Sequence, residues 1–165
     1  MSAVQVAFVR IAVVYLVGTG ALGLWFLVDP TWAWAFRTTH VHAGVLGFFL
    51  SLVMGVAFWL LPRPGGVRTP RLEAWTLVLF HGGLAVRTVF EPWLRLGSAP
   101  AVAEPLLWAS GVATLAGMGL FAVSVWGRAR TPEELRRARE RRDATPVVAS
   151  ERDAPRTSHG AGRSR

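Results

Sequence analysis

Four long apolar segments constrain this chain of 165 residues more than any other feature. They cover about residues 4–28, 31–61, 71–91 and 104–126. Each is at least as long as the roughly 20 residues that an apolar helix needs to cross a bilayer core about 30 Å thick. Four such helices would leave little surface to face water in a soluble domain. The pattern therefore predicts an all-α fold, an integral membrane four-helix bundle over residues 1–126.

The basic charge of the chain is concentrated after this bundle. The formal net charge is +8, and arginine supplies all 18 positive side chains other than histidine. Residues 1–126 carry seven arginines against four acids, whereas residues 127–165 carry eleven against six. We expect residues 127–165 to form a basic, largely disordered cytoplasmic tail with a short helix near 132–142. The tail is expected to touch anionic lipid, and nucleic acid is not an expected partner.

The placement of arginine predicts an orientation in the membrane. Arg63, Arg68 and Arg71 lie at the connection between the second and third segments, and further arginines follow the fourth. Short cytoplasmic loops are enriched in arginine and lysine. Both termini are therefore expected to be cytoplasmic, in a multi-pass protein of the inner (cytoplasmic) membrane whose first partner is the lipid bilayer.

Three histidines, His40, His42 and His81, lie within the apolar segments. Ionisable side chains are costly inside a membrane, so each is a hypothesis for a functional site. The chain has no cysteine, which leaves imidazole as the principal metal ligand and favours heme or copper. The alternative is that these histidines only form hydrogen bonds between helices.

Helix-end signals predict that His40 and His81 lie at the same depth. A start at Asp29–Pro30 and an end near Glu91–Pro92 place each histidine about 15 Å from the outer end of its helix. Measured from the inner ends, however, the two depths differ by about 15 Å. We favour the outer measurement because it rests on capping signals.

The neighbours of the two histidines on the second segment favour His40 as the ligand. His40 and His42 are about 200° apart around a helix, so they cannot bind the same iron. The face of His40 continues through the small residues Gly44, Gly47, Ser51 and Gly55. Such a face leaves room for a flat macrocycle, although it equally suits ordinary helix packing. We therefore expect His40 and His81 to be the axial ligands of one heme.

Three arginines are candidate partners of that heme. Arg37, Arg87 and Arg95 are predicted toward the outer side, where a guanidinium can pair with a heme propionate. Arg87 is the deepest of the three, and Glu91 is its alternative partner. Snorkelling to the membrane surface is the alternative for Arg37 and Arg95.

One stretch resembles a known family. Arg37-Thr38-Thr39-His40-Val41-His42-Ala43-Gly44, continuing to Trp59-Leu60-Leu61-Pro62-Arg63, resembles the heme-ligating helix of heme-copper oxidase subunit I. It is most similar to the nitric oxide reductase and C-type cytochrome oxidase branches. The resemblance covers residues 37–63 and implies a heme b, with His40 matching the low-spin ligand. Full-length subunit I has many more helices and three further copper-binding histidines, so its reduction chemistry is not carried over.

The sequence thus supports two hypotheses of different classes. The first is a membrane b-type heme-binding protein that acts in electron transfer, in gas sensing or as an accessory respiratory subunit. The second is a heme-free structural or assembly subunit of a membrane respiratory complex. Respiratory subunits or a second copy of the chain are the expected protein partners. Copper held by His40 and His42 is a weaker third option, and no catalytic residue is predicted.

Overall fold

The computed structural model describes residues 2–61, 70–126, 128 and 132–143, and the regular structure in these ranges is helical. Residues 1–129 form one compact unit, and residues 130–165 form a second. The expectations based on Arg63 and Arg68, and the expected disorder beyond residue 143, lie outside the described residues.

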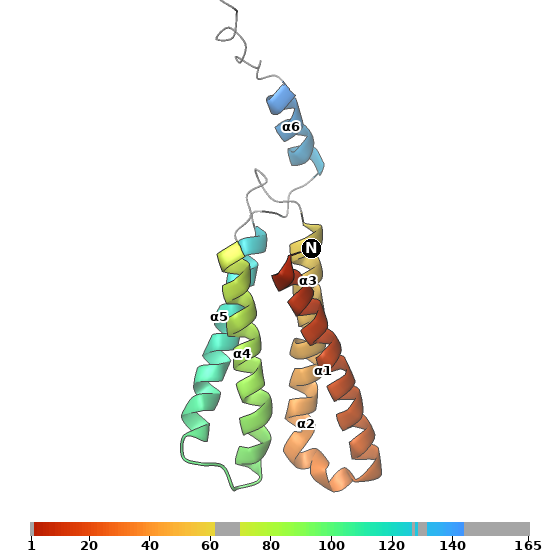
Figure 1. The fold of residues 1–165 in the computed structure, drawn as a ribbon, viewed down its shortest axis with the longest axis vertical. Coiled ribbons are helices and arrows are strands. Elements are labelled where there is room, and N and C mark those ends of the chain that lie inside the picture. The colour runs from red at the N-terminus through yellow and green to blue at the C-terminus, as the bar shows by residue number, and fades with distance from the viewer. Residues whose placement is uncertain (1, 62–69, 127, 129–131, 144–165) are drawn as a thin grey trace, which may run out of the picture. The chain divides into compact units, whose positions relative to one another are not determined.

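The first hairpin consists of α1 (Ala3–Val28) and a helical run over Pro30–Leu60. A reciprocal capping box between Ser2 and Gln5 starts α1, because each side chain hydrogen-bonds the other residue's backbone N–H. The second run is divided into η1 (Pro30–Trp32), α2 (Ala33–His42), η2 (Ala43–Leu50) and α3 (Ser51–Leu60). Figure 1 shows α1 beside this run along its whole length.

Asp29 turns the chain between the two helices of the first hairpin, as its sequence context predicts. Its carboxylate accepts hydrogen bonds from the hydroxyl and the backbone N–H of Thr31. These bonds hold the pKa of Asp29 below its ordinary value. The helical run therefore begins at Pro30 with an ionised cap, which is favourable at a helix N-terminus.

A π-helical segment, η2, separates α2 from α3. It covers eight residues, Ala43–Leu50, immediately after His42. Its hydrogen bonds reach one residue further than those of an α-helix, so it turns less per residue and changes which side chains share a face. His42 before it and Ser51 after it both face α4, as their contacts below show.

The second hairpin consists of α4 (Pro70–Arg95) and α5 (Ala103–Trp126). The expected end of the third segment near Glu91–Pro92 is wrong, because Pro92 is buried inside α4 and the helix continues to Arg95. Arg95 donates to Thr38 Oγ1 (2.9 Å) and to the carbonyl of Trp34 (3.4 Å). We attribute the continuation to these contacts and to the burial of Pro92, since proline disfavours but does not forbid a helical residue before it.

Three helices of the described residues are long and apolar enough to cross a membrane: Ala3–Val28, Pro30–Leu60 and Ala103–Trp126. The fourth predicted span, α4, has 26 residues but is more polar. It buries much of that polarity against its neighbours, since Glu73, Thr76 and His81 are all buried. These findings support a membrane protein, and α4 as a fourth span remains a prediction.

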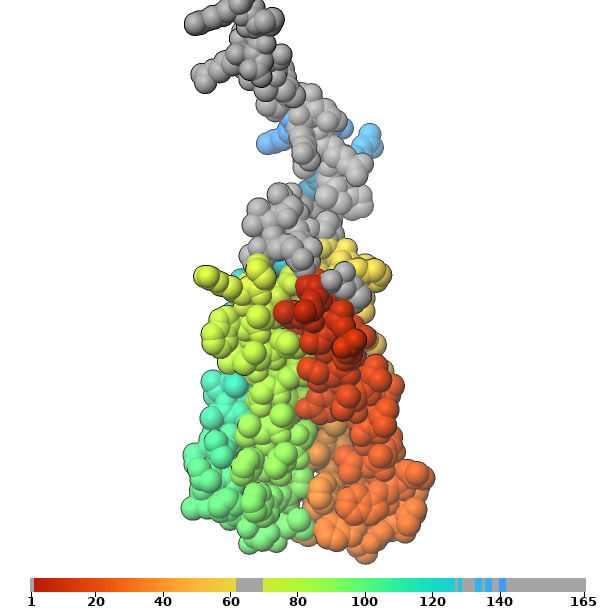
Figure 2. All heavy atoms as spheres, viewed as in Figure 1, coloured from red at the N-terminus to blue at the C-terminus, as the bar shows by residue number. Residues whose placement is uncertain are grey.

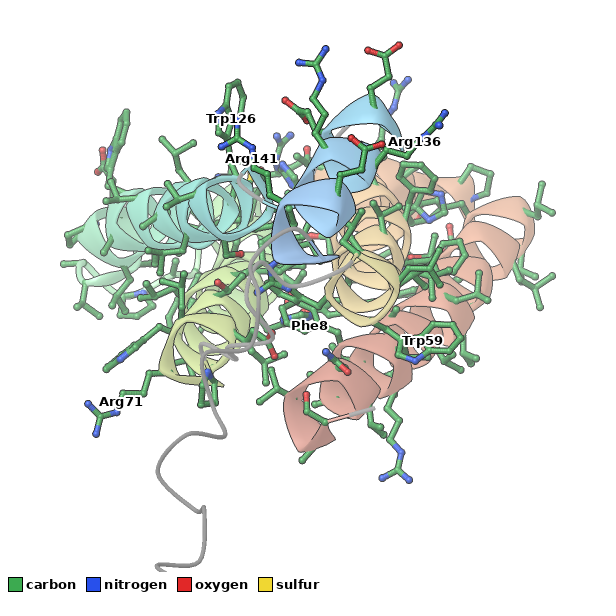
Figure 3. The ribbon with its side chains drawn as sticks, turned by 90° about the horizontal axis from the view of Figure 1, so that it is seen from above. Phe8, Trp59, Arg71, Trp126, Arg136 and Arg141 are labelled. Carbon is green, nitrogen blue, oxygen red and sulfur yellow. The ribbon has the colours of Figure 1, made fainter. Side chains whose placement is uncertain are left out.

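An aromatic core joins the two hairpins. Phe8, Met54, Phe58 and Phe80 form a buried cluster with contributions from α1, α3 and α4. Figure 3 looks along the helices and shows Phe8 pointing into the bundle, whereas labelled Trp59, Arg71 and Trp126 point away from it. The large side chains that face outward are mostly apolar, as a lipid-facing surface requires.

The C-terminal unit contains one described helix, α6 (Pro132–Asp143). Its position confirms the short helix expected near 132–142. Glu133 and Glu134 occupy its first turn, where negative charge is favourable. Arg136, Arg137 and Arg141 are exposed on it.

Candidate functional site

Polar side chains lie at three depths in the bundle, mainly where the two hairpins meet. We call this set the polar seam and define it as His42, Ser51, Glu73, His81, Glu91, Arg95 and Arg128. The end of the bundle that holds Asp29 and Gly97 is called the loop end, and the end that holds Ser2 and Arg71 the terminal end. Figure 2 shows the two hairpins packed side by side, with α1 and α2 in red and orange beside α4 in green.

His81 lies at the middle depth and is only 8% exposed. Its Nε2 is 2.9 Å from Ser51 Oγ, and its Nδ1 is 3.3 Å from the carbonyl of Leu77. Its ring also packs edge-on against Phe8 and Phe80, with centroids 5.1 and 5.0 Å away. Polar and aromatic contacts together fix this imidazole between α1, α3 and α4.

The hydrogen bonds around His81 restrict which further atoms its two ring nitrogens can bind. Ser51 Oγ also contacts the carbonyl of Phe8 at 3.0 Å and has one hydrogen to donate. If Ser51 donates to Phe8, then His81 Nε2 donates to Ser51. If Ser51 donates to His81 instead, Nε2 accepts and Nδ1 can donate to Leu77. In either arrangement Nε2 is occupied by the serine and has no room for a metal.

The loop-end depth holds a carboxylate that lies beside two arginines and one histidine. Glu91 Oε2 lies 3.4 Å from both His42 Nδ1 and Arg87 Nε, and Glu91 Oε1 lies 3.9 Å from Arg95 Nη2. The two 3.4 Å contacts are within ion-pair distance, but their geometry is not that of a hydrogen bond. The partly buried carboxylate of Glu91 therefore contacts two guanidinium groups and one imidazole.

The terminal-end depth holds a buried ion pair that the sequence did not reveal. Arg128 Nη2 lies 3.4 Å from Glu73 Oε1, and these side chains are 5% and 1% exposed. The guanidinium also lies 5.6 Å from the centre of the Phe58 ring in α3. One sequence feature did point to it: Glu73 lies in the first turn of an apolar helix, where a buried charge needs a partner. Arg128 is one of the arginines that follow the fourth segment, from which the sequence predicts only an orientation in the membrane.

The expected alignment of His40 with His81 is wrong. His40 lies against α1, with its ring centre 5.6 Å from that of Phe26 and its Cε1 beside Gly23. His81 instead lies beside Ser51, eleven residues after His40, which is roughly 16 Å along a helix. The depths measured from the inner helix ends, which differ by about 15 Å, therefore agree with the structure. Continuation of α4 to Arg95 explains part of the error.

The small-residue face of the second segment is filled by α1. A Cβ built at Gly44 would contact Thr19, one at Gly47 would overlap the Tyr15 ring, and one at Gly55 would touch Phe8. The glycines thus permit close helix packing. The residues present do not fit a heme held jointly by His40 and His81, because the imidazoles lie at different depths and this face leaves no room for a macrocycle.

The other predicted ligands have separate surroundings. His40 contacts α1 and His42 contacts α4, so the expectation that they face different ways is confirmed. Arg87 pairs with Glu91, and Arg37 is exposed. Within the described residues, no group of three histidines, cysteines, aspartates or glutamates is placed to hold a metal ion.

Comparison with known proteins gives no identification. No model of a protein family matches the chain, and no curated protein or solved structure matches it either. The resemblance of residues 37–63 to heme-copper oxidase subunit I therefore remains a prediction from the sequence.

Proposed function

We propose that this chain is a heme-free structural or assembly subunit of a membrane respiratory complex. The observation that carries the proposal is the Ser51–His81 contact, which uses the most buried histidine of the bundle to join α3 to α4. His42 likewise contacts Glu91 of α4. These two histidines act as interhelical links, the alternative that the sequence left open. The respiratory assignment rests on the resemblance of residues 37–63.

Large apolar side chains on the outside of the bundle supply a surface for lipid or for a partner subunit. Val14, Val17 and Leu27 on α1 are 70%, 67% and 82% exposed, and Trp108 and Val123 on α5 are 75% and 71% exposed. A bilayer covers such surfaces without difficulty. A partner subunit would cover only some of them, so its position can be mapped residue by residue.

Site-specific photo-crosslinking in native membranes tests the proposal. A photoreactive residue at Val17 or Val123 reports what covers α1 or α5, and one at buried Met54 is the matched control. We expect one of the exposed positions to yield a discrete adduct with a respiratory membrane protein and Met54 to yield none. Adducts with lipid alone at every exposed position would contradict the subunit role.

Heme binding by a single histidine is a second candidate, and one observation favours it. His40 Nδ1 is buried and has no hydrogen-bond partner among the described residues. His40 is also the residue that the resemblance assigns to a low-spin heme. A heme there would supply electron-transfer or gas-sensing chemistry, and His81 would not contribute. Absorption that is lost in His40→Ala but kept in His81→Ala would support this candidate over the first.

A further inference from the structure

A hollow on the second hairpin combines an apolar wall with two opposite charges. It lies between α4 and α5, has a volume of about 460 Å³, and is lined chiefly by Arg87, Glu104, Leu107, Trp108, Gly111 and Leu115. Arg87 connects this hollow to the polar seam through its contact with Glu91, and the other lining residues lie outside the seam. Because α5 is long and apolar enough to cross a membrane, the hollow would open toward lipid.

The packing of the two helices sets the order of the charges. Gly83 packs against Ser110 and Thr114, and Gly117 packs against Phe80, which fixes the antiparallel register of α4 and α5. Arg87 is therefore at the depth of Gly111. Glu104 lies seven residues closer to the loop end, about 10 Å along the helix axis.

The arginine of the hollow is only partly neutralised. Arg87 Nε lies 3.4 Å from Glu91, but Glu91 is shared with Arg95. The Arg87 side chain remains 34% exposed, and its Nη1 lies 3.6 Å from where a Cβ of Gly111 would be. The end of the guanidinium thus reaches the hollow, where an anionic group can meet it with two parallel hydrogen bonds.

We propose that this hollow binds one phospholipid with a zwitterionic, primary-amine head group, such as phosphatidylethanolamine. Its phosphate would pair with Arg87 and its ammonium with Glu104, while an acyl chain would lie along Gly111 and Leu115. The proposal rests on the membrane placement of α4 and α5 and is independent of the subunit role.

The order of charges selects this lipid class over others. In such a lipid the phosphate lies between the ammonium and the acyl chains, which matches an arginine deeper than the glutamate. A primary ammonium donates hydrogen bonds to a carboxylate, whereas a quaternary choline cannot. A glycerol head group would place no positive charge beside Glu104.

Native mass spectrometry of the full chain tests this selection. The protein is equilibrated in detergent with equal amounts of phosphatidylethanolamine, phosphatidylcholine and phosphatidylglycerol, and bound lipids are counted. We expect one retained lipid, with the ethanolamine lipid preferred. Arg87→Gln should lower retention of all three by about tenfold, as expected for loss of a charge-assisted hydrogen bond. Arg87→Lys should recover part of it.

Charge variants elsewhere separate the site from general charge effects. Glu104→Gln should remove the preference for ethanolamine over choline without abolishing retention. Arg71→Gln and Asp29→Asn, which remove an exposed arginine and a carboxylate outside the hollow, should leave the preference unchanged.

A steric variant keeps the proposal testable if Arg87→Gln disturbs the fold. Gly111→Leu would fill the hollow, whereas Gly119→Leu places the same side chain on α5 where nothing lies within 4 Å. Loss of the retained lipid in the first variant only is the expected result. Equal retention of the three lipids in the wild type, or no difference between the two leucine variants, would show an incidental lipid only and overturn the proposal.

Discussion

The hydroxyl of Ser51 lies 2.9 Å from Nε2 of His81 and joins α3 to α4 at the middle of the bundle. The same hydroxyl contacts the carbonyl of Phe8 in α1. One buried serine therefore connects three helices. This position explains why the histidine lies in an apolar helix without requiring a metal.

Removal of that hydroxyl should destabilise the bundle. Ser51→Ala leaves buried hydrogen-bonding groups on His81 or Phe8 unsatisfied, and we expect a loss of about 1–3 kcal/mol. Unfolding in mixed micelles with increasing denaturing detergent measures it. The control is Ser124→Ala, whose hydroxyl donates to the carbonyl of Phe121 in its own helix. Equal losses in the two variants would show that the interhelical contact contributes nothing.

Close packing of α4 on α5 gives a second prediction. A Cβ at Gly83 would collide with backbone atoms of Ser110 and Thr114, which cannot move aside cheaply, whereas the neighbouring Gly82 has nothing within 4 Å. Gly83→Ala should therefore lower stability by about 1–3 kcal/mol, and Gly82→Ala should change it little. The same unfolding assay compares them, and equal stability would contradict the interface.

The buried pair at the terminal end gives a third prediction. Arg128→Ala would leave Glu73 buried beside an apolar cluster, and we expect a loss of about 3 kcal/mol. Arg71→Ala, at an exposed arginine on the same helix as Glu73, should have almost no effect. Replacing both partners, as in Glu73→Leu with Arg128→Met, should recover most of the loss. A double variant no better than Arg128→Ala would argue against the pairing.

The shared carboxylate at the loop end gives a fourth prediction. Glu91→Gln should destabilise the contact between α2 and α4 by about 1–2 kcal/mol, less than a fully buried pair because Arg87 and Arg95 are 34% and 44% exposed. A double-mutant cycle with Arg95→Gln measures the coupling. Exposed Arg37→Gln serves as the uncoupled partner, and equal coupling of both arginines to Glu91 would contradict the geometry.

The helices could be predicted from the sequence because their signals are local. Apolar length placed α1 and α5 within one residue of their observed ends, and Asp29 capped the helical run after it as expected. The short helix in the tail followed from the helix-start sequence Thr131-Pro132-Glu133-Glu134. Each of these features depends on a few adjacent residues.

The sequence identified His42, His81 and the Arg87–Glu91 pair, but the arrangement of the site could not be predicted because it depends on register between helices. Pro92 predicted the end of α4 but is accommodated within it, so the depth of His81 measured from that end was wrong by about one helical turn. The π-helical segment after His42 changes which residues face α4, and no single residue type marks it. The sequence indicated only a topology role for Arg128, because its partner Glu73 lies 55 residues away in the chain.

The reduced-minus-oxidised absorption spectrum of the full-length protein tests the central claim most directly. The protein would be purified in mild detergent from cells supplied with heme, with heme and protein quantified together. We predict no stoichiometric b-type band, and unchanged spectra for His40→Ala and His81→Ala. A stoichiometric band in the wild type would contradict the account: its loss in both variants would place the two histidines on one heme, and its loss in His40→Ala alone would place the heme on His40.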